Sequence, residues 1–336
     1  MRALITASFH PDGLERLRRH MDVVHEDWRR EKKIYFDCEA FAERLRAAQA
    51  DVLIVEADLV RDELFDTGLL RLIGTCRGDP INVDLERATA LGIPVLYAPA
   101  RNADAVADLT LALLLGLIRH VVEVNIAIKS GEMRFESAKD YLDVYGRYGG
   151  FELGSATVGI VGVGAIGQRV AKRCAAFGAR ILAFDPGQPD DAFASCGAAR
   201  SSLEDMLPKC DVLTIHCPEM PATYQLIGRN EIARLKPGAF LLNLARASIV
   251  DDDAFYEALV AGHLAGAALD VFRDEPVQPD NRFARLPNVI VTPHLGGATR
   301  DVVRHQTEMM VSGIESWLRG ERPMWVANPA VELLAP

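Results

Sequence analysis

Three side chains that could do acid–base or electrostatic chemistry follow directly after apolar runs of the chain: Arg246, Glu275 and His294. A guanidinium can grip a carboxylate through two parallel hydrogen bonds and polarise a carbonyl group. An imidazole can accept a hydroxyl proton, and a carboxylate bonded to its other nitrogen fixes its tautomer. This set is suited to the interconversion of a 2-hydroxy acid and a 2-keto acid. Taken singly, each residue has an ordinary alternative as a solvated charge, a turn residue or a loop histidine.

The strongest local motif is a glycine-rich turn, Gly162-x-Gly164-x-x-Gly167, which lies between an apolar run and a helical pattern. In such a turn the first glycine permits a sharp bend and the second lets the backbone approach a pyrophosphate. The third glycine lets the helix pack closely on the sheet. The first helical residues, Ala165 and Ile166, would then present backbone N–H groups to an anion. The motif therefore predicts a dinucleotide-binding site.

An acidic residue stands at the distance that this motif requires. Asp185 ends the next apolar run, at about the spacing of 20 residues from the last glycine that is typical of dinucleotide sites. Its carboxylate would bond the adenosine ribose hydroxyls and repel a 2′-phosphate, so NAD is the predicted cofactor rather than NADP. The alternative is a glycine turn required only by packing, followed by a solvated aspartate.

Short apolar runs alternate with helical patterns along the whole chain, as in parallel α/β proteins whose sheets are covered on both faces. Similar hexads at Ala50–Val55 and Cys210–Ile215 indicate two doubly wound units. A long helix is predicted to follow the N-cap Asn102, and Glu132–Glu152 is predicted to be a loop or an arm. The predicted strands are Ala3–Thr6, Val52–Val55, Leu72–Cys76, Val95–Tyr97, Thr157–Val161, Ile181–Phe184, Val212–His216, Phe240–Asn243, Ala267–Val271 and Val289–Thr292. Ligands of such sheets bind at the carboxyl ends of the strands, where the three chemical side chains stand.

The composition of the chain argues against several classes of protein and of site. The chain has 336 residues and a formal net charge of −10, which favours two domains and argues against nucleic acid as a partner. The most apolar stretch, Leu109–Ile118, is shorter than the roughly 20 residues of a membrane span. The cysteines are scattered and form no CxxC pair, so neither a disulfide framework nor a metal site is expected. Together with a start that lacks the layout of a signal peptide, these features predict a cytoplasmic location.

The chain resembles the D-isomer-specific 2-hydroxyacid dehydrogenase family, and within it the D-3-phosphoglycerate dehydrogenase-like branch. The resemblance covers most of the chain and rests on short motifs in the family's order. Besides the glycine-rich turn, these are Asn82-Val83-Asp84, Gly92-Ile93-Pro94-Val95, Asn102 with Ala105–Asp108, His216-Cys217-Pro218, Leu235-Lys236-Pro237-Gly238, Asn243–Arg246, Asp270–Pro276 and Thr292–Gly297.

The resemblance implies a fold of two doubly wound parallel-sheet lobes, with a Rossmann NAD-binding domain inserted in a flavodoxin-like substrate domain. The discontinuous substrate-binding domain would comprise residues 1–102 and 297–336, and the NAD-binding domain residues 103–296. Family members are usually homodimers. The implied activity is the NAD-dependent interconversion of a small, anionic D-2-hydroxy acid and its 2-keto acid.

The resemblance also implies roles for individual residues. Arg246 would orient the substrate as an electrophile, His294 would act as acid and base, and Glu275 would be its partner. Asp270 would bond the nicotinamide amide. Further cofactor contacts would come from His216, Cys217, Pro218 and Gly297, and substrate contacts from Arg77, Gly78, Asp79 and Arg101 as well as Arg246 and His294.

Some positions depart from the family's pattern. Ala247 replaces the usual glycine after the catalytic arginine, Asp79 places a negative charge in the substrate loop, and Ala100 replaces another usual glycine. These changes leave several substrates open: phosphoglycerate, glycerate with hydroxypyruvate, glyoxylate or a longer sugar acid. Arg134 is a further candidate for a substrate contact, with a solvated surface arginine as the alternative.

An alternative from another class is an NAD(H)-sensing, corepressor-like interaction protein on the same fold. The presence of Arg246, Glu275 and His294 argues for chemistry instead, because a sensor needs only the cofactor half.

Overall fold

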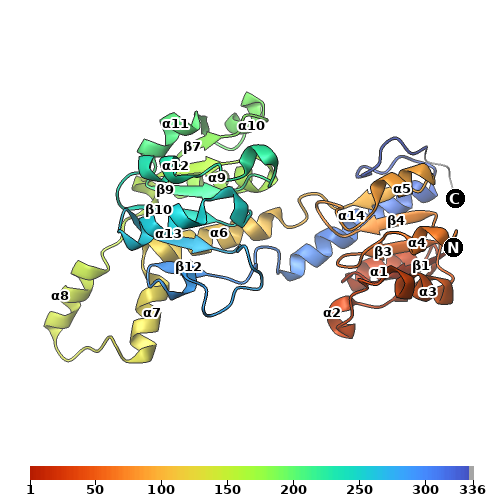
Figure 1. Cartoon of the computed structure of the whole chain (residues 1–336), viewed down its shortest axis with the longest axis horizontal. Helices are drawn as coiled ribbons and strands as arrows, with labels where there is room; N and C mark the ends of the chain where they lie inside the picture. Colours follow the sequence, from red (N-terminus) through yellow and green to blue (C-terminus); the bar gives the residue numbers. More distant parts are fainter. Residues whose placement is uncertain (333–336) are drawn as a thin grey trace. The chain divides into compact units, whose positions relative to one another are not determined.

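The computed structural model describes residues 1–332 of the chain and divides it into two compact units (Figure 1). Unit 1 consists of Met1–Asn102 together with the segment from Thr299 onward, and unit 2 consists of Ala103–Ala298. The domain boundaries expected from the sequence were residues 102 and 296.

Unit 1 is built on a five-stranded, fully parallel sheet with the strand order β2-β1-β3-β4-β5. This order is that of the flavodoxin-like doubly wound fold. Nearly every residue of the central strands is buried, as expected for a sheet with helices on both faces. The strands are β1 (Arg2–Ile5), β2 (Asp22–His25), β3 (Val52–Val55), β4 (Leu72–Thr75) and β5 (Val95–Tyr97).

The helices of unit 1 include one from the far end of the chain. α14 (Arg300–Leu318) buries Met310, Val311 and Trp317 in the same core as residues of β3 and β4, so the chain returns to complete its first unit. The other helices are α1 (Pro11–Arg18), α2 (Trp28–Glu31), α3 (Cys38–Ala48), α4 (Glu63–Asp66) and α5 (Leu85–Ala90).

Unit 2 is built on a seven-stranded parallel sheet with the order β12-β11-β10-β9-β6-β7-β8. Counted from β6, this is the Rossmann order 3-2-1-4-5-6 with one further strand. The fold class predicted from the sequence is thereby confirmed. The strands are β6 (Thr157–Val161), β7 (Arg180–Phe184), β8 (Ala199–Arg200), β9 (Val212–Ile215), β10 (Ala239–Asn243), β11 (Leu264–Leu269) and β12 (Val289–Val291).

The helices of unit 2 cover both faces of this sheet, except for two that leave it (Figure 1). α6 (Ala103–Ile118) and α9 (Ala165–Ala176) share one core with β6 and β10. In contrast, α7 (Val121–Ser130) and α8 (Ala138–Arg147) contain no buried residue. The remaining helices are α10 (Asp190–Ala194), α11 (Leu203–Met206), α12 (Arg229–Arg234) and α13 (Asp252–Val260).

The structure contains every strand predicted from the sequence and adds two, β2 and β8. Both lie at sheet edges and are not continuously buried, so they lack the apolar run that marks a central strand. The prediction of an irregular Glu132–Glu152 segment was wrong in part, because α8 forms there. A capping box between Ser137 and Asp140 starts this helix.

Within the described residues, no single helix has the length and apolar composition to cross a membrane. The pair α6 and α7 reaches that length and composition together, with a bend of 64° between them.

Candidate active site

The glycine-rich turn has the close contacts that only glycine allows. Gly162 has a φ of +95°, and a Cβ there would lie 2.5 Å from the backbone nitrogen of Cys217. A Cβ on Gly167 would lie 1.9 Å from the carbonyl oxygen of Gly162. Both positions are therefore fixed by the tight turn and by the packing of α9 on β6.

The second glycine of the motif, Gly164, faces open space. A Cβ on Gly164 would meet no atom within 4 Å, and no side chain caps α9 at this residue. Ala165 and Ile166 form the first turn of the helix, whose N-terminus favours an anion. Asp185, at the end of β7, accepts hydrogen bonds from the backbone nitrogens of Val163 (2.8 Å) and Gly187 (2.9 Å). The turn thus has the open, amide-lined form that a dinucleotide pyrophosphate requires.

His216 follows β9 and lies beside Gly162, with one ring nitrogen unpaired. Its Nε2 lies 2.9 Å from Thr214 Oγ1, whereas Nδ1 is buried without a partner in the described part of the chain. Burial lowers the pKa of His216 to about 3, so the ring is neutral near neutral pH. The adjacent Cys217 is half-buried, and burial raises its pKa to about 11. An orphaned polar atom beside the glycine turn fits a cofactor that supplies its partner.

The turn that carries Arg246 is shaped by Asn243. The buried Asn243 donates from Nδ2 to the carbonyl oxygen of Arg246 (2.8 Å) and accepts from the backbone nitrogen of Ala245 (3.0 Å). Arg246 is exposed and donates to the carbonyl oxygen of Ala245 (2.7 Å). Ala247 starts a short 3-10 helix without a positive φ, so the family's glycine is not required here for conformational reasons. Sequence reasoning assigned no role to Asn243.

Glu275 and His294, predicted as partners, meet directly. The Glu275 carboxylate lies 2.7 Å from Nδ1 of His294 and accepts a second bond from the backbone nitrogen of Phe272 (3.0 Å). An ionised carboxylate only accepts, so the ring proton lies on Nδ1 and Nε2 is left open. His294 is half exposed, with 48% of its side chain accessible. The pair therefore presents an oriented imidazole to solvent or to a ligand.

Asp270 holds the turn on which His294 stands. Its buried carboxylate accepts hydrogen bonds from Thr292 Oγ1 (2.6 Å) and from the backbone nitrogens of Leu295 (2.7 Å) and Gly296 (2.8 Å). These bonds surround His294, which has a left-handed φ of +57°. The nicotinamide contact that the family resemblance implies for Asp270 stays a prediction, as do the cofactor roles of Pro218 and Gly297.

The predicted substrate residues of unit 1 lie at the carboxyl ends of β4 and β5. Arg77 is half-buried, whereas Gly78 and Asp79 are exposed. The side chain of Arg101 is only 18% exposed and is paired with Glu56, a buried residue at the end of β3 that sequence reasoning missed. Arg134 of unit 2 is exposed and donates to the carbonyl oxygen of Gly131 (2.9 Å). The substrate roles of these residues stay predictions.

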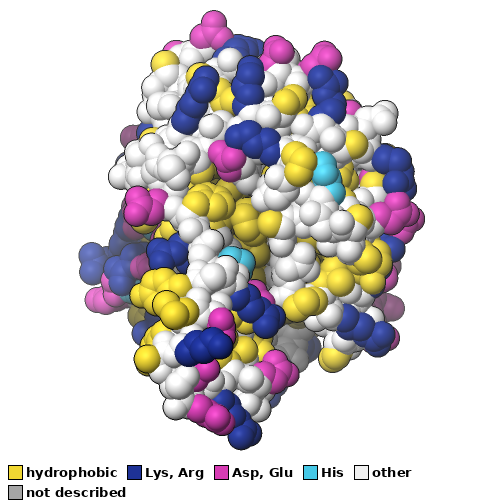
Figure 2. Space-filling model, turned by 90° about the vertical axis from the view of Figure 1, so that its left-hand side faces the viewer, with side chains coloured by type: hydrophobic (Ala, Val, Ile, Leu, Met, Phe, Trp, Pro, Cys, Tyr) yellow, Lys and Arg dark blue, Asp and Glu magenta, His cyan; other side chains and the backbone are white. Residues whose placement is uncertain are grey.

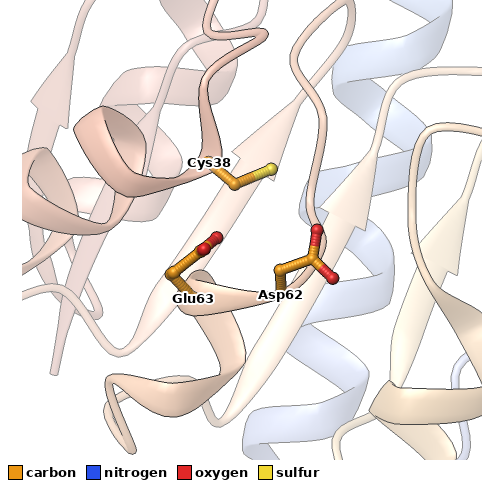
Figure 3. A group of neighbouring side chains, drawn as sticks. All are labelled: Cys38, Asp62 and Glu63. Carbon is orange, nitrogen blue, oxygen red and sulfur yellow. The ribbon is translucent and has the colours of Figure 1, made fainter.

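Figure 3 shows a separate cluster in unit 1, formed by Cys38, Asp62 and Glu63. Their potential ligand atoms lie within 4.8 Å of one another, but both acids are exposed. Burial raises the pKa of the Cys38 thiol, which disfavours the thiolate form that binds metals. We therefore assign no function to this cluster.

The comparisons with known proteins agree on one family. Residues 111–296 match the family described as "D-isomer specific 2-hydroxyacid dehydrogenase, NAD binding domain". A glyoxylate reductase of Korarchaeum cryptofilum is 32% identical and aligns over 100% of this chain and 98% of its own length. A D-3-phosphoglycerate dehydrogenase of Methanocaldococcus jannaschii is 34% identical over 98% of this chain, which spans 59% of that relative.

A solved structure extends the similarity to the fold. The D-lactate dehydrogenase of Aquifex aeolicus, complexed with NAD and lactic acid, has a TM-score of 0.75 and 25% identity. The similarity covers 98% of this chain and 99% of that one. None of these findings favours the corepressor-like alternative.

Proposed function

Because this chain belongs to the D-isomer specific 2-hydroxyacid dehydrogenase family and is an NAD-dependent oxidoreductase, we propose that it interconverts a small D-2-hydroxy acid and its 2-keto acid. Glyoxylate, hydroxypyruvate and 3-phosphohydroxypyruvate are the keto acids that we consider first. The relatives named as glyoxylate reductase and D-3-phosphoglycerate dehydrogenase support this choice. The observation that carries the proposal is the oriented imidazole of His294 on Glu275.

We assign the proton transfer to Nε2 of His294. In the oxidation of the hydroxy acid this nitrogen takes the hydroxyl proton, and in the reduction of the keto acid the protonated ring returns it. Glu275, hydrogen-bonded at Nδ1, keeps the ring in the required tautomer and stabilises its charged form. Arg246 would hold the substrate and polarise its carbonyl group through its guanidinium. When bound, NAD supplies the hydride acceptor or donor.

The test is a kinetic assay of purified protein with NADH and a panel of 2-keto acids. We expect oxidation of NADH with at least one acid, and a fall in kcat of about 10²-fold or more in His294→Ala. Arg246→Ala should raise KM and lower kcat. Arg180→Ala is a matched control, since Arg180 is an exposed arginine at the amino end of β7. If none of the keto acids supports NADH oxidation, the proposed activity is refuted. Unchanged kinetics in Arg246→Ala would remove that residue from the site.

We also propose a homodimer that is formed through α7 and α8. Neither helix buries a residue within the chain, and ten-residue helices are marginal in water without tertiary packing. Figure 2 views unit 2 from the side on which these helices lie in Figure 1 and shows hydrophobic side chains gathered in a hollow. The exposed apolar residues of this arm are Val121, Val122, Ile126, Ile128, Phe135, Tyr141, Leu142 and Tyr145. A second copy of the arm would cover them.

Sedimentation of the protein tests this proposal. We expect twice the chain mass of 36.8 kDa for the wild type, and the single-chain mass for a Leu142→Asp, Tyr145→Asp double variant. Phe177→Asp is the matched control, because Phe177 is an exposed apolar residue of unit 2 outside the arm. A wild type that sediments as a monomer, or a double variant that remains a dimer, would refute the proposed interface.

We propose a cytoplasmic location on the basis of cysteine usage. All six cysteines are free thiols in the described structure, as is usual in a reducing compartment. Fractionation of cells that produce the protein would test the location.

A further inference from the structure

Glu56, at the carboxyl end of β3, is the centre of a buried polar cluster in unit 1. Only 5% of the residue is exposed. Five donor groups surround its carboxylate at 3.1–3.5 Å: the backbone nitrogen of Ser8, Nε1 of Trp28, Nη2 of Arg29, Nη1 of Arg101 and Nε2 of Gln306. These residues come from both ends of the unit's sequence. We call this set the Glu56 cluster.

The Glu56 cluster can offer hydrogen-bond donors to a ligand, but its central carboxylate is not available as an acceptor. Ser8, Trp28 and Gln306 donate hydrogen bonds to Oε2 of Glu56, and the two guanidinium groups lie 3.4–3.5 Å from its Oε1 as ion pairs. The carboxylate is buried among these five donors, so a ligand does not reach it. What the cluster leaves open is the far side of its guanidinium groups.

Arg101 is held along one edge only. Its Nη1 bonds Gln306 Oε1 and lies 3.4 Å from Glu56 Oε1. In residues 1–332, its Nε and Nη2 donate no hydrogen bond. These two nitrogens form the side edge of the guanidinium, which matches the two oxygens of a carboxylate or phosphate. Glu56 thus fixes one nitrogen of Arg101 and leaves a two-pronged donor available.

Arg101 also continues the segment that touches the predicted substrate loop of the same unit. The backbone nitrogen of Ala98 donates to the carbonyl oxygen of Arg77 (2.8 Å). A Cβ on Gly78 would lie 3.7 Å from the carbonyl oxygen of Ala98 and 3.8 Å from the nitrogen of Ala100. Arg101 therefore follows in the chain directly after the backbone that packs against the predicted substrate residues Arg77 and Gly78.

We infer that Arg101 binds an anionic group at the far end of the 2-keto acid, and that Glu56 is the positioning residue that orients Arg101 for it. The inference rests on the proposed function and names its substrate class: 2-keto acids that carry a phosphate or a second carboxylate beyond C2. Glyoxylate, which has no such tail, makes no use of the Glu56 cluster.

The experiment compares kcat and KM for three keto acids in the full-length protein with NADH. 3-Phosphohydroxypyruvate carries a phosphate tail, oxaloacetate a carboxylate tail, and glyoxylate none. In Arg101→Lys the charge remains but the two-pronged edge is lost. We expect kcat/KM for the preferred tailed acid to fall about 10-fold further than that for glyoxylate, through KM.

Glu56→Gln tests the positioning role. An amide retains one acceptor for the neutral donors but loses the charge that holds Arg101, so we expect the same substrate-dependent rise in KM with little change in kcat. Arg44→Lys is the matched control. Arg44 is a partly buried arginine of unit 1 that pairs with Glu26, outside the cluster, and its variant should keep the wild-type ratio of tailed to untailed activity. Thermal unfolding of each variant reports any loss of folding.

The outcomes separate the two claims. A wild type that reduces no 2-keto acid refutes the proposed function itself. A wild type that reduces glyoxylate, with an Arg101→Lys variant that loses tailed and untailed activity equally, overturns only the anionic-tail inference. A selective loss in Arg101→Lys without one in Glu56→Gln overturns the positioning role of Glu56. The preference between 3-phosphohydroxypyruvate and oxaloacetate identifies the tail as phosphate or carboxylate.

Discussion

The neutral, buried imidazole of His216 makes the stability of unit 2 depend on pH in a way that one substitution should abolish. Burial lowers its pKa from the ordinary 6.5 to about 3 in the folded protein. Between these two values the unfolded chain binds the proton and the folded chain does not. The free energy of unfolding therefore falls as the pH is lowered from about 6.5 toward 3, and is unaffected by this group above about 6.5.

The size of the effect follows from the difference between the two pKa values. Each pH unit inside the window contributes about 1.4 kcal/mol. At about pH 4.5, two units below the ordinary value, the folded state has lost about 3 kcal/mol through this residue. Carboxyl groups also contribute to the pH dependence, and burial raises the pKa of one of them, Asp252. These groups are common to wild type and variants, so their effects cancel in the difference between the two.

The assay is urea unfolding of wild type, His216→Gln and His216→Asn at about pH 7 and pH 4.5. Far-UV circular dichroism follows both units, whereas the tryptophans Trp28, Trp317 and Trp325 all lie in unit 1 and report that unit alone. We expect the wild type to lose about 3 kcal/mol more than either variant on acidification. The two variants can differ in stability at neutral pH but should share one pH dependence. A parallel fall in all three proteins would show that the imidazole is protonated in the folded state, and would refute its assignment as a dry, neutral group.

Four further substitutions test other parts of the structure. Glu275→Gln should lower kcat by about 10-fold or more with NADH binding unchanged, measured by steady-state kinetics and NADH fluorescence; an undiminished kcat would contradict the role of the carboxylate. Ala100→Gly should raise the stability of unit 1 by about 1 kcal/mol, because Ala100 has a left-handed φ of +57°, which strains a residue with a Cβ. Urea unfolding followed by tryptophan fluorescence measures this change, and an unchanged midpoint would disprove the strain. Gly167→Ala should destabilise unit 2 by at least about 1–3 kcal/mol, since its Cβ would overlap the carbonyl oxygen of Gly162. In Gly164→Ala the new Cβ meets no protein atom, so this variant should keep the stability of unit 2 and bind NADH more weakly. Equal losses of stability in Gly164→Ala and Gly167→Ala would argue against tight packing at Gly167 as the cause.

The part of the site that the sequence could predict is the part that parallel-strand topology brings together. Residues that follow consecutive strands of a parallel sheet reach the same edge, whatever their separation in the chain. Glu275 and His294 follow β11 and β12, and they are hydrogen-bonded at 2.7 Å. For the same reason Asp185, after β7, reaches the turn that follows β6 and bonds Val163. Strand order explains why these residues meet, whereas the pairing of Glu275 with His294 was predicted from the resemblance to the family.

The residues that sequence reasoning missed act through contacts that no local pattern encodes. Asn243 shapes the Arg246 turn by two bonds to backbone atoms, and any polar residue at a strand end looks similar in the sequence. Glu56 stands in an apolar run and carries a charge that the run gives no reason to bury. Its partners include Gln306, which lies at the other end of the chain and reaches unit 1 only because α14 returns to it. Such a cluster becomes visible only when the tertiary fold is known.

The net charge of −10 shows the same limit at the level of the whole chain. It argues against a polyanionic partner such as nucleic acid, which needs a wide basic surface. It does not argue against small anions, because their binding depends on a few oriented donors. At the N-terminus of α9 those donors are backbone amides beside an open glycine position, and at Arg101 they are two guanidinium nitrogens that a buried carboxylate holds in place. In the second case the negative charge of Glu56 helps to create the anion site, since it orients the cation without occupying its free edge.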